Sequence, residues 1–558
     1  MLFLSVPLFG RRLAGFFFAA FFLATSPIAF AQTKAEPGRT GNLVSVEWLK
    51  RNLARKDLVL LDASAPPAYM KGHIPGAISA SILAHGVQEM SPERMEARYR
   101  GYGIKDDSLI VVYEQGDAMS DFQPMWSHHL FYDLYYHGFP PNRLLLLDGG
   151  LEKWKAEGGE VTATPTAKPE AGNFRVTQTR EAVRVRLPDV LVASGDPKKA
   201  TLIEALEPDN HFGEKGFFDR TGHIPNSVML PARDFFNADR TFKSPEELRR
   251  MFDYLGVKPG QTVYSHCGGG VAAAVPFFAL KFILEHEDVR LFRESQVGWL
   301  QDDRGLPFWT YSAPQMMRDT TWAKTWGGAM MRMYRNSAID FIDARPVEDF
   351  KFRHARFALN VPAATVRPHL HDPAKLASLF GEAGVNVNNE ALVMAGSGIT
   401  PDAALVYVAL EAAGQKRVSV LPEGLELAAT KGLAVNDAAK ASAAPPVVKR
   451  AYQASPRGAT IIRNAGETRG LYPKVFVVSD TKPLGKTPPG KVVQLPYTEM
   501  LRPDGTPKAA KDLWKLMSDA GIPRYAELVT VGEDAGAAAV NYLVLKLMGF
   551  PDVKVWVP

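Results

Sequence analysis

Cys267 is the single cysteine of this 558-residue chain, and its neighbours are unusual for a cysteine that serves only packing. It lies in the run Ser265-His266-Cys267-Gly268-Gly269-Gly270-Val271-Ala272. Three successive glycines let the backbone curl so that its N–H groups converge on an anion, and a helix start adds partial positive charge. Both effects favour a thiolate, so the loop predicts a sulfur nucleophile with a lowered pKa. The alternative is a buried, unreactive thiol.

A thiolate in such a loop can attack the outer sulfur of a donor and hold it as a persulfide, which an acceptor thiol or cyanide then removes. The N–H groups of residues 268–272 would stabilise the negative charge of both states. This chemistry requires no metal and no organic cofactor, and we expect neither.

Two other functions are disfavoured by the same residues. Cysteine phosphatases bind an oxyanion with an arginine a few positions after the cysteine, whereas residues 268–274 carry no cation. The formal net charge of the chain is +5, which is too small and too scattered to indicate nucleic-acid binding.

The elements that would position this loop occur four times, at a period of about 140 residues. Each copy opens with a short apolar strand that ends in an acid, and these acids are Asp62, Glu204, Asp343 and Asp480. A later apolar strand runs into a small-residue loop and a helix, and the expected strands are 109–113, 262–264, 391–394 and 528–531. Apolar strands that alternate with helical stretches indicate a parallel sheet covered on both faces.

The sequence therefore predicts an α/β protein of four tandem domains, each a mostly parallel sheet with helices on both faces. The expected ranges are 40–165, 183–310, 325–435 and 446–558. The linking segments are expected where Pro, Ala, Thr and Lys replace periodic sequence, at 162–179, 311–336 and 436–458.

The other three copies lack a nucleophile at the corresponding loop. The third reads Ala395-Gly-Ser-Gly-Ile-Thr400, with alanine in the cysteine position, which suggests a site that has lost catalysis but could still bind an anion. The first and fourth loops, 114–117 and 532–536, are acidic and would repel an anionic donor. We expect those two copies to be structural.

Residues 1–31 predict a signal peptide and export to the periplasm. Arg11 and Arg12 precede an apolar run, and Ala29-Phe30-Ala31 places small residues where a signal peptidase reads them. Cleavage before Gln32 would leave no stable membrane insertion. The alternative is an uncleaved anchor, because the apolar stretch is nearly long enough to span a bilayer.

Together these pieces resemble the rhodanese (sulfurtransferase) family. Three features carry the resemblance: the Gly-His-Ile-Pro turns at 72–75 and 222–225, the strand–Cys-Gly-Gly-Gly-Val–helix unit at 262–284, and the ending Asp148-Gly149-Gly150. The resemblance implies a sulfurtransferase that moves a sulfane sulfur from a small donor, 3-mercaptopyruvate or thiosulfate. The acceptor would be a thiol, that of a protein included, or cyanide, and the intermediate a Cys267 persulfide.

The loop is most similar to that of mercaptopyruvate sulfurtransferases, Cys-Gly-Ser-Gly-Val-Thr, with departures at Gly269 and Ala272. In that family the loop serine has been proposed to act with a histidine and an aspartate of the preceding domain. His73 and Asp62 match those two, but Gly269 has no hydroxyl to donate.

The resemblance also assigns a substrate arginine to Arg220, which precedes the second Gly-His-Ile-Pro turn; the alternative is a solvated surface residue. His73 and His223 are expected mainly to stabilise their turns. The expected nucleophile is thus Cys267. The expected substrate-binding residues are Gly268, Gly269, Gly270, Val271, Ala272 and Arg220.

The rival function is a non-catalytic persulfide carrier or an anion-binding scaffold in the periplasm. Loss of the loop Ser and Thr and of a second family arginine, whose place His211 or Phe212 takes, keeps this reading open.

Overall fold

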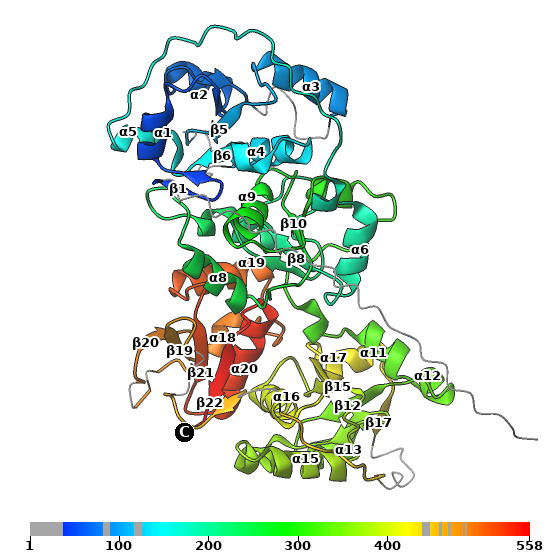
Figure 1. The fold of residues 1–558 in the computed structure, drawn as a ribbon. Coiled ribbons are helices and arrows are strands. Elements are labelled where there is room, and N and C mark those ends of the chain that lie inside the picture. Colours follow the sequence, from blue (N-terminus) through cyan, green and yellow to red (C-terminus); the bar gives the residue numbers. More distant parts are fainter. Residues whose placement is uncertain are drawn as a thin grey trace, which may run out of the picture.

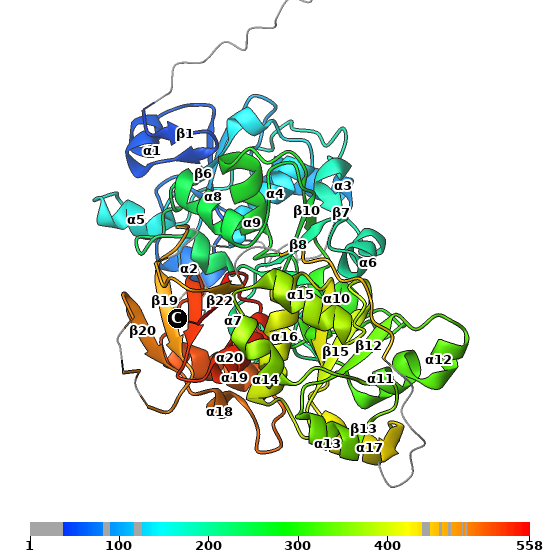
Figure 2. The same ribbon diagram turned by 90° about the horizontal axis from the view of Figure 1, so that it is seen from below.

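The computed structural model describes residues 37–81, 90–116, 125–437, 447–456, 460–466, 470–482, 484–485 and 488–557. The expected signal peptide, residues 1–31, lies outside these ranges. Figures 1 and 2 show the described chain in two perpendicular views.

Four mainly parallel sheets follow one another along the chain. When the strands of each are numbered by sequence, the first, second and fourth share the spatial order 1-5-4-2-3. The first sheet runs β2 (Leu43–Val44), β6 (Leu144–Leu147), β5 (Leu109–Tyr113), β3 (Leu58–Asp62) and β4 (Ile78–Ser79), with β1 (Arg39–Thr40) antiparallel to β2. The second runs β7 (Arg184–Val185), β11 (Val289–Phe292), β10 (Val263–His266), β8 (Thr201–Glu204) and β9 (Ser227–Met229).

The third and fourth sheets follow the same plan. The third runs β16 (Arg417–Val420), β15 (Glu390–Met394), β12 (Ile339–Asp343) and β14 (Leu359–Asn360), and Met317 forms a parallel bridge to Val420 where a first strand would lie. The fourth runs β18 (Ile461–Ile462), β22 (Val553–Trp556), β21 (Glu527–Val531), β19 (Lys474–Val478) and β20 (Lys491–Gln494). A separate antiparallel pair joins β13 (Arg353–Ala355) to β17 (Val435–Asp437).

Both faces of these sheets are buried, as the apolar strands predict. In β5, Ile110 and Val112 pack into one hydrophobic cluster, whereas Leu109, Val111 and Tyr113 pack into another. Since successive side chains of a strand point to opposite faces, the two clusters cover the two faces of the sheet.

Helices lie on both sides of these sheets; six of them, at the contacts between sheets and in the segment 311–336, are described below. Those of the first half are α1 (Val46–Asn52), α2 (Pro66–Lys71), α3 (Pro92–Gly101), α5 (Gly150–Ala156), α6 (Leu187–Gly195), α7 (Pro208–His211), α8 (Pro245–Tyr254) and α10 (Ser295–Leu300). Those of the second half are α13 (Val347–Phe352), α14 (Ala363–Val366), α15 (Pro373–Glu382), α17 (Gly424–Thr430), α18 (Tyr497–Met500) and α19 (Ala510–Asp519). In the described part of the chain, no helix is sufficiently long and apolar to cross a bilayer.

The sheets associate in two pairs through the helices that follow β5, β10, β15 and β21. Helix α4 (Trp126–Tyr136) packs against α9 (Ala274–Phe278), and α16 (Pro401–Ala413) packs against α20 (Ala535–Leu547), as Figure 1 shows. The rings of Phe131 and Phe278 meet edge-to-face with centroids 4.9 Å apart. The Tyr542 hydroxyl donates to Glu411 Oε2 at 2.7 Å.

The second unit, from the first pair, contacts the fourth unit, from the other pair. The Tyr254 hydroxyl donates to the Ala526 carbonyl at 2.8 Å, and the rings of Phe212 and Trp514 stack with centroids 5.2 Å apart. Asp234 pairs with Arg524 and accepts the Tyr525 hydroxyl at 2.7 Å. The fourth unit, orange to red in Figure 1, therefore contacts both the second and the third.

The segment 311–336 differs from the linker that its composition suggested. It holds α11 (Thr320–Gly327) and α12 (Ala329–Met333), and the Asp319 carboxylate caps α11 by accepting the Trp322 N–H at 2.7 Å. Gly327 ends α11 and Gly328 separates it from α12. These two glycines interrupt the helical periodicity of the segment, so the sequence did not predict the two helices.

Candidate active site around Cys267

Cys267 directly follows β10, a central strand of the second sheet that pairs with β8 on one side and β11 on the other. The carboxyl ends of parallel strands are where α/β proteins place their reactive groups. The side chain is almost completely buried, with 3% of the residue exposed.

The start of α10 fixes the backbone of the loop. The N–H of Gln296 donates to the Cys267 carbonyl and that of Val297 to the Gly268 carbonyl, each at 3.1 Å. The Ser265 hydroxyl closes the loop by donating to the Ala273 carbonyl at 2.7 Å.

The same anchoring bonds recur in the first and third sheets. The Leu151 N–H donates to the Glu114 carbonyl at 2.9 Å, and the Leu425 N–H donates to the Ala395 carbonyl at 2.8 Å. Glu114, Cys267 and Ala395 therefore occupy equivalent positions, directly after β5, β10 and β15.

Backbone N–H groups converge on the Cys267 sulfur. Gly270 donates to Sγ at 3.1 Å, and the backbones of Gly269 and Ala273 also hydrogen-bond to the thiol. Gly270 has φ +94°, and a Cβ there would come within 2.3 Å of the Arg293 carbonyl oxygen, so only glycine fits. Of the expected donors, Gly269 and Gly270 thus face the sulfur, and Ala273 joins them.

Burial nevertheless raises the pKa of the Cys267 thiol, and the hydrogen bonds from Ala273, Gly270, Gly269 and Ser295 only partly offset this effect. The lowered pKa expected from the sequence is therefore not found in this state. The reason is that Cys267 belongs to the hydrophobic cluster shared by the first two sheets, where a thiolate is poorly solvated.

Ser295 was not identified from the sequence. Its Oγ accepts the Cys267 N–H at 3.0 Å and donates to the Phe292 carbonyl at 2.8 Å. Its φ is +50°, in the left-handed region, and the corresponding residues of the first and third sheets are Gly150 (φ +59°) and Gly424 (φ +67°). Alignment of Asp148-Gly149-Gly150 with Arg293-Glu294-Ser295 would have located it. A serine where glycine is easier is a form of backbone strain that is common at reactive sites.

Phe217 covers the loop from outside. Its ring lies so close to Gly268 that a Cβ on that glycine would approach ring atom Cδ2 to 3.1 Å, yet the residue itself is 50% exposed. Its neighbour Phe218 is 41% exposed. Phe217 thus lies between solvent and the glycine that follows Cys267.

The first sheet supports the loop through a buried ion pair. The Arg293 guanidinium, whose residue packs against Gly270, pairs with the Asp133 carboxylate of α4. Burial disfavours ionisation of Asp133, but the charge and hydrogen bond of Arg293, together with the field of His129 when it is protonated, outweigh burial and lower the pKa of Asp133 to about 2. The residues that the preceding unit brings to this loop therefore come from α4.

His73 and Asp62 serve the first sheet. The His73 Nδ1 donates to the Tyr69 carbonyl at 2.8 Å, in keeping with a role in the turn, and Asp62 accepts the Ser64 N–H at 2.9 Å. Arg220 donates from Nη1 to the Leu306 carbonyl at 2.7 Å. Its guanidinium is thus tied to the end of the second unit.

Glu114 fills the loop of the first sheet with its own carboxyl group. The Trp126 N–H donates to Glu114 Oε2 at 2.9 Å and the Ser127 hydroxyl to Oε1 at 3.1 Å. Burial raises the pKa of Glu114 to about 8, so the group is mainly protonated at pH 7. In the first loop the carboxyl group of Glu114 thus takes the place that the side chain of Cys267 has in the second loop.

The buried group Glu204, His211 and His223 offers donor atoms that lie within 4.8 Å of one another. The two imidazole rings stack in parallel, 3.6 Å apart and inclined by 2°. A metal lies near the plane of each imidazole ligand, and one ion cannot satisfy two parallel planes at this spacing. His211 Nδ1 already bonds Glu204, so this arrangement does not fit a metal centre.

Parts of this chain are similar to known proteins. The model of the rhodanese-like domain matches residues 45–157. The sulfur carrier protein TtuD of Thermus thermophilus is 26% identical over 276 residues, which are 46% of this chain and 93% of that protein. A putative thiosulfate sulfurtransferase of Synechococcus elongatus is 28% identical over 301 residues, 49% of this chain and 90% of that protein. The solved structure of SseA from Escherichia coli, a 3-mercaptopyruvate sulfotransferase, superposes with a TM-score of 0.41 at 24% identity over 46% of this chain and 99% of its own.

Proposed function

We propose that this chain, with its rhodanese-like domain at residues 45–157, is a rhodanese-type sulfurtransferase built from four such repeats, of which the second is catalytic. The proposed repeats are 40–165, 183–310, 325–435 and 446–558. The strand order that the first, second and fourth sheets share and the bonds that anchor the loops of the first three support this division.

In the proposed reaction the Cys267 thiolate attacks the outer sulfur of a donor such as thiosulfate or 3-mercaptopyruvate. A bond forms between Sγ and that sulfur, and the donor leaves with the electron pair of the broken bond, as sulfite or as the enolate of pyruvate, which takes up the proton of the donor thiol to become pyruvate. An acceptor thiolate or cyanide then attacks the outer sulfur, which restores the Cys267 thiolate. The N–H groups directed at Sγ carry this proposal, because they can stabilise the thiolate and the persulfide.

Donor binding is proposed for residues 268–272 and for Arg220. No cation lies in the loop, which favours mercaptopyruvate over the dianionic thiosulfate. For Arg220 to meet the mercaptopyruvate carboxylate, its guanidinium must exchange the Leu306 carbonyl for the donor. Residues 1–31 support the further proposal that the mature protein acts in the periplasm.

A non-catalytic persulfide carrier is the second candidate, and the burial of Cys267 favours it. A thiol with a raised pKa that is 3% exposed suits a sulfur held for one partner better than rapid exchange with free donors. The relative named a sulfur carrier protein points the same way.

Counting sulfurs separates the two candidates. The protein is incubated with mercaptopyruvate or thiosulfate and excess cyanide, and thiocyanate is measured while intact mass reports sulfur bound to the chain. A sulfurtransferase forms many thiocyanates per chain, whereas a carrier forms about one. Cys267→Ser should form none and add no sulfur; turnover by that variant would rule out Cys267 as the nucleophile.

A further inference from the structure

His211 lies between an acid and a hydroxyl, and the bonds of its two ring nitrogens go to these two groups and not to Cys267. Its Nδ1 bonds the Glu204 carboxylate, and its Nε2 lies 3.0 Å from Ser312 Oγ. We propose that Ser312, His211 and Glu204 form a second reactive site, at which Ser312 is acylated by small esters that have a good leaving group.

The three side chains are held in the order that this chemistry needs. Glu204 ends β8 and His211 ends α7, both in the second unit. Ser312 lies in the segment that leads from the second unit to the third. Gln296 Nε2 donates to the other Glu204 oxygen at 2.8 Å, which fixes the carboxyl group. When His211 donates Nδ1–H to Glu204, its Nε2 lone pair faces the Ser312 hydroxyl, as in acid–base–nucleophile triads.

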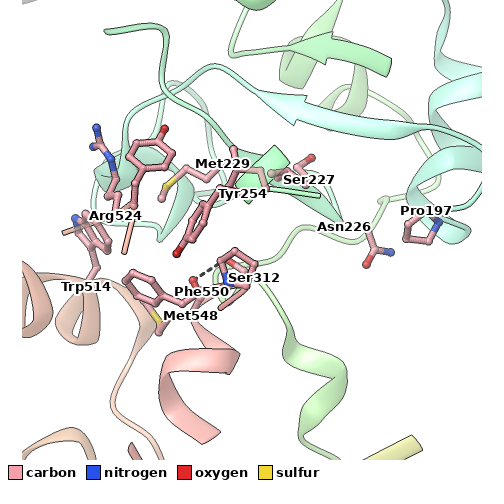
Figure 3. A pocket seen from close by; sticks show the side chains of 15 residues that line it. Pro197, Asn226, Ser227, Met229, Tyr254, Ser312, Trp514, Arg524, Met548 and Phe550 are labelled. Atoms are coloured by element: carbon pink, nitrogen blue, oxygen red, sulfur yellow. Dashed lines mark hydrogen bonds between the residues drawn. The ribbon is translucent and has the colours of Figure 1, made fainter. Parts of the chain in front are cut away.

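Ser312 is accessible from a cavity of about 210 Å³ between the second and fourth units. Figure 3 shows Ser312 beside Phe550, with Tyr254 and Met229 above them and Trp514 farther along the wall. These walls are mainly apolar. The nearby Arg524 is paired with Asp234, so the cavity suits a small, uncharged acyl group rather than an anion.

The Ser312 hydroxyl has one proton and two acceptors within reach. It donates to the Met548 carbonyl at 3.2 Å or to His211 Nε2 at 3.0 Å, and only the second arrangement prepares the oxygen for attack.

The reaction balances with water as the co-reactant. Ser312 Oγ bonds the carbonyl carbon and its proton passes to His211 Nε2; the bond to the leaving oxygen breaks, and that oxygen takes the proton from His211. Water then attacks the acyl-serine, releasing a carboxylic acid and free Ser312. Burial lowers the pKa of His211 to about 3, so the imidazole is neutral at pH 7 but a weak base. A weak base suits aryl esters, whose leaving groups need little assistance.

The same cavity contains a matched control. Ser227 lines it and bonds His266 Nε2 at 2.7 Å, as Ser312 bonds His211. Among the described residues, no carboxylate bonds His266 Nδ1, so this pair lacks the acid. Comparison of the two serines tests the triad against mere location in the cavity.

The test uses the full chain with Cys267→Ala, which removes the reactive thiol. Phenylmethylsulfonyl fluoride labelling, mapped by mass spectrometry, and the release of p-nitrophenol from p-nitrophenyl acetate are measured. We expect the label on Ser312, none after Ser312→Ala, unchanged labelling after Ser227→Ala, and an ester rate about 100-fold lower after His211→Gln.

A label elsewhere, or an equal ester rate in Ser312→Ala, would overturn the proposal. Because His211 is buried, its replacement could unfold the chain, so Ser312→Ala with an unchanged melting temperature is the deciding variant. Ser312→Ala made in the chain that keeps Cys267 should form thiocyanate at the rate of the unaltered protein, which separates this site from sulfur transfer at Cys267.

Discussion

Ser295 Oγ holds the backbone N–H of Cys267 at 3.0 Å and lies 4.0 Å from the Cys267 sulfur. The hydroxyl proton points to the Phe292 carbonyl in this state. Rotation about the side-chain bond would direct it to a thiolate or persulfide. Ser295 thus supplies, from the next strand end, the hydroxyl that Gly269 cannot.

Ser295→Gly should separate activity from stability. Glycine adopts a φ of +50° without strain, which should offset part of the roughly 1–3 kcal/mol lost when the buried Cys267 N–H has no acceptor, so the free energy of unfolding should fall by about 2 kcal/mol at most. Loss of a hydrogen bond to a charged sulfur should lower kcat/KM for sulfur transfer about 10- to 100-fold. Urea unfolding and the thiocyanate assay measure the two effects. An active glycine variant would assign Ser295 to loop structure alone.

Phe217→Ala should open access to Cys267. The ring lies against Gly268, so its removal should speed iodoacetamide alkylation of Cys267 by about 3- to 10-fold. Phe218→Ala is the matched control, since Phe218 is similarly exposed, and should leave the rate unchanged. Equal effects of the two would show that the segment as a whole limits access. Because the pKa of Cys267 is raised, both rates should increase with pH beyond the usual range of a thiol.

Glu114→Gln should stabilise the protein at high pH only. In the folded chain the pKa of Glu114 is raised to about 8, so between about pH 4.5 and 8 the unfolded chain ionises this group first and folding is penalised as pH rises. Glutamine cannot ionise, and its amide can still accept the Trp126 N–H and donate to Ser127. We expect a gain of about 1–3 kcal/mol at pH 8 and none at pH 4, from urea unfolding. An equal gain in the free energy of unfolding at pH 4 and at pH 8 would contradict the raised pKa of Glu114.

Four buried histidines should make the protein acid-sensitive. Burial lowers the pKa of His129 and His266 to about 4 and of His211 and His223 to about 3. As pH falls below about 6.5, the unfolded chain binds protons that the folded chain refuses, so each histidine reduces stability by up to about 1.4 kcal/mol per pH unit. In a plot of the free energy of unfolding against pH, replacement of His129 by glutamine should reduce the slope between pH 6 and 5 by up to about 1.4 kcal/mol per pH unit. An unchanged slope would show that His129 is already protonated when folded.

Ala395→Cys should create a second site of persulfide formation. The N–H groups of Leu425 and Glu426 hold the carbonyls of Ala395 and Gly396 as those of Gln296 and Val297 hold the active loop. In a chain that also carries Cys267→Ser, intact mass should show one added sulfur after treatment with donor.

The fourth loop provides the control for this gain of function. A Cβ on Gly532 would lie 2.9 Å from Asp480 Oδ2, whose negative charge opposes a thiolate. Gly532→Cys with Cys267→Ser should therefore take up no sulfur. If the Ala395→Cys chain takes up none either, the third loop resembles the active one in packing alone.

The strands were predictable because their residues are continuously apolar, and β3 and β5 have the bounds that the sequence indicated. The loop glycines were predictable for a similar local reason, since only glycine allows the curl at Gly270. The segment 311–336 was not, because two glycines hide its helices.

The contacts that complete the site depend on distant parts of the chain. Arg293 meets Asp133 across 160 positions, and no local pattern reports such a pair. The raised pKa of Cys267 likewise follows from packing between two units, which the loop sequence does not contain. Local sequence thus predicts which groups could react, whereas their protonation depends on tertiary burial.

The bond from Tyr254 to Ala526 joins residues 272 positions apart. At about 5–20 residues per second, a ribosome needs roughly 15–55 s to make the intervening chain. During that interval the second unit can fold while Tyr254 and Phe212 still lack their neighbours from the fourth. A nascent chain therefore presents an apolar face that a chaperone, or the same face of another nascent chain, can bind before the late C-terminal residues cover it.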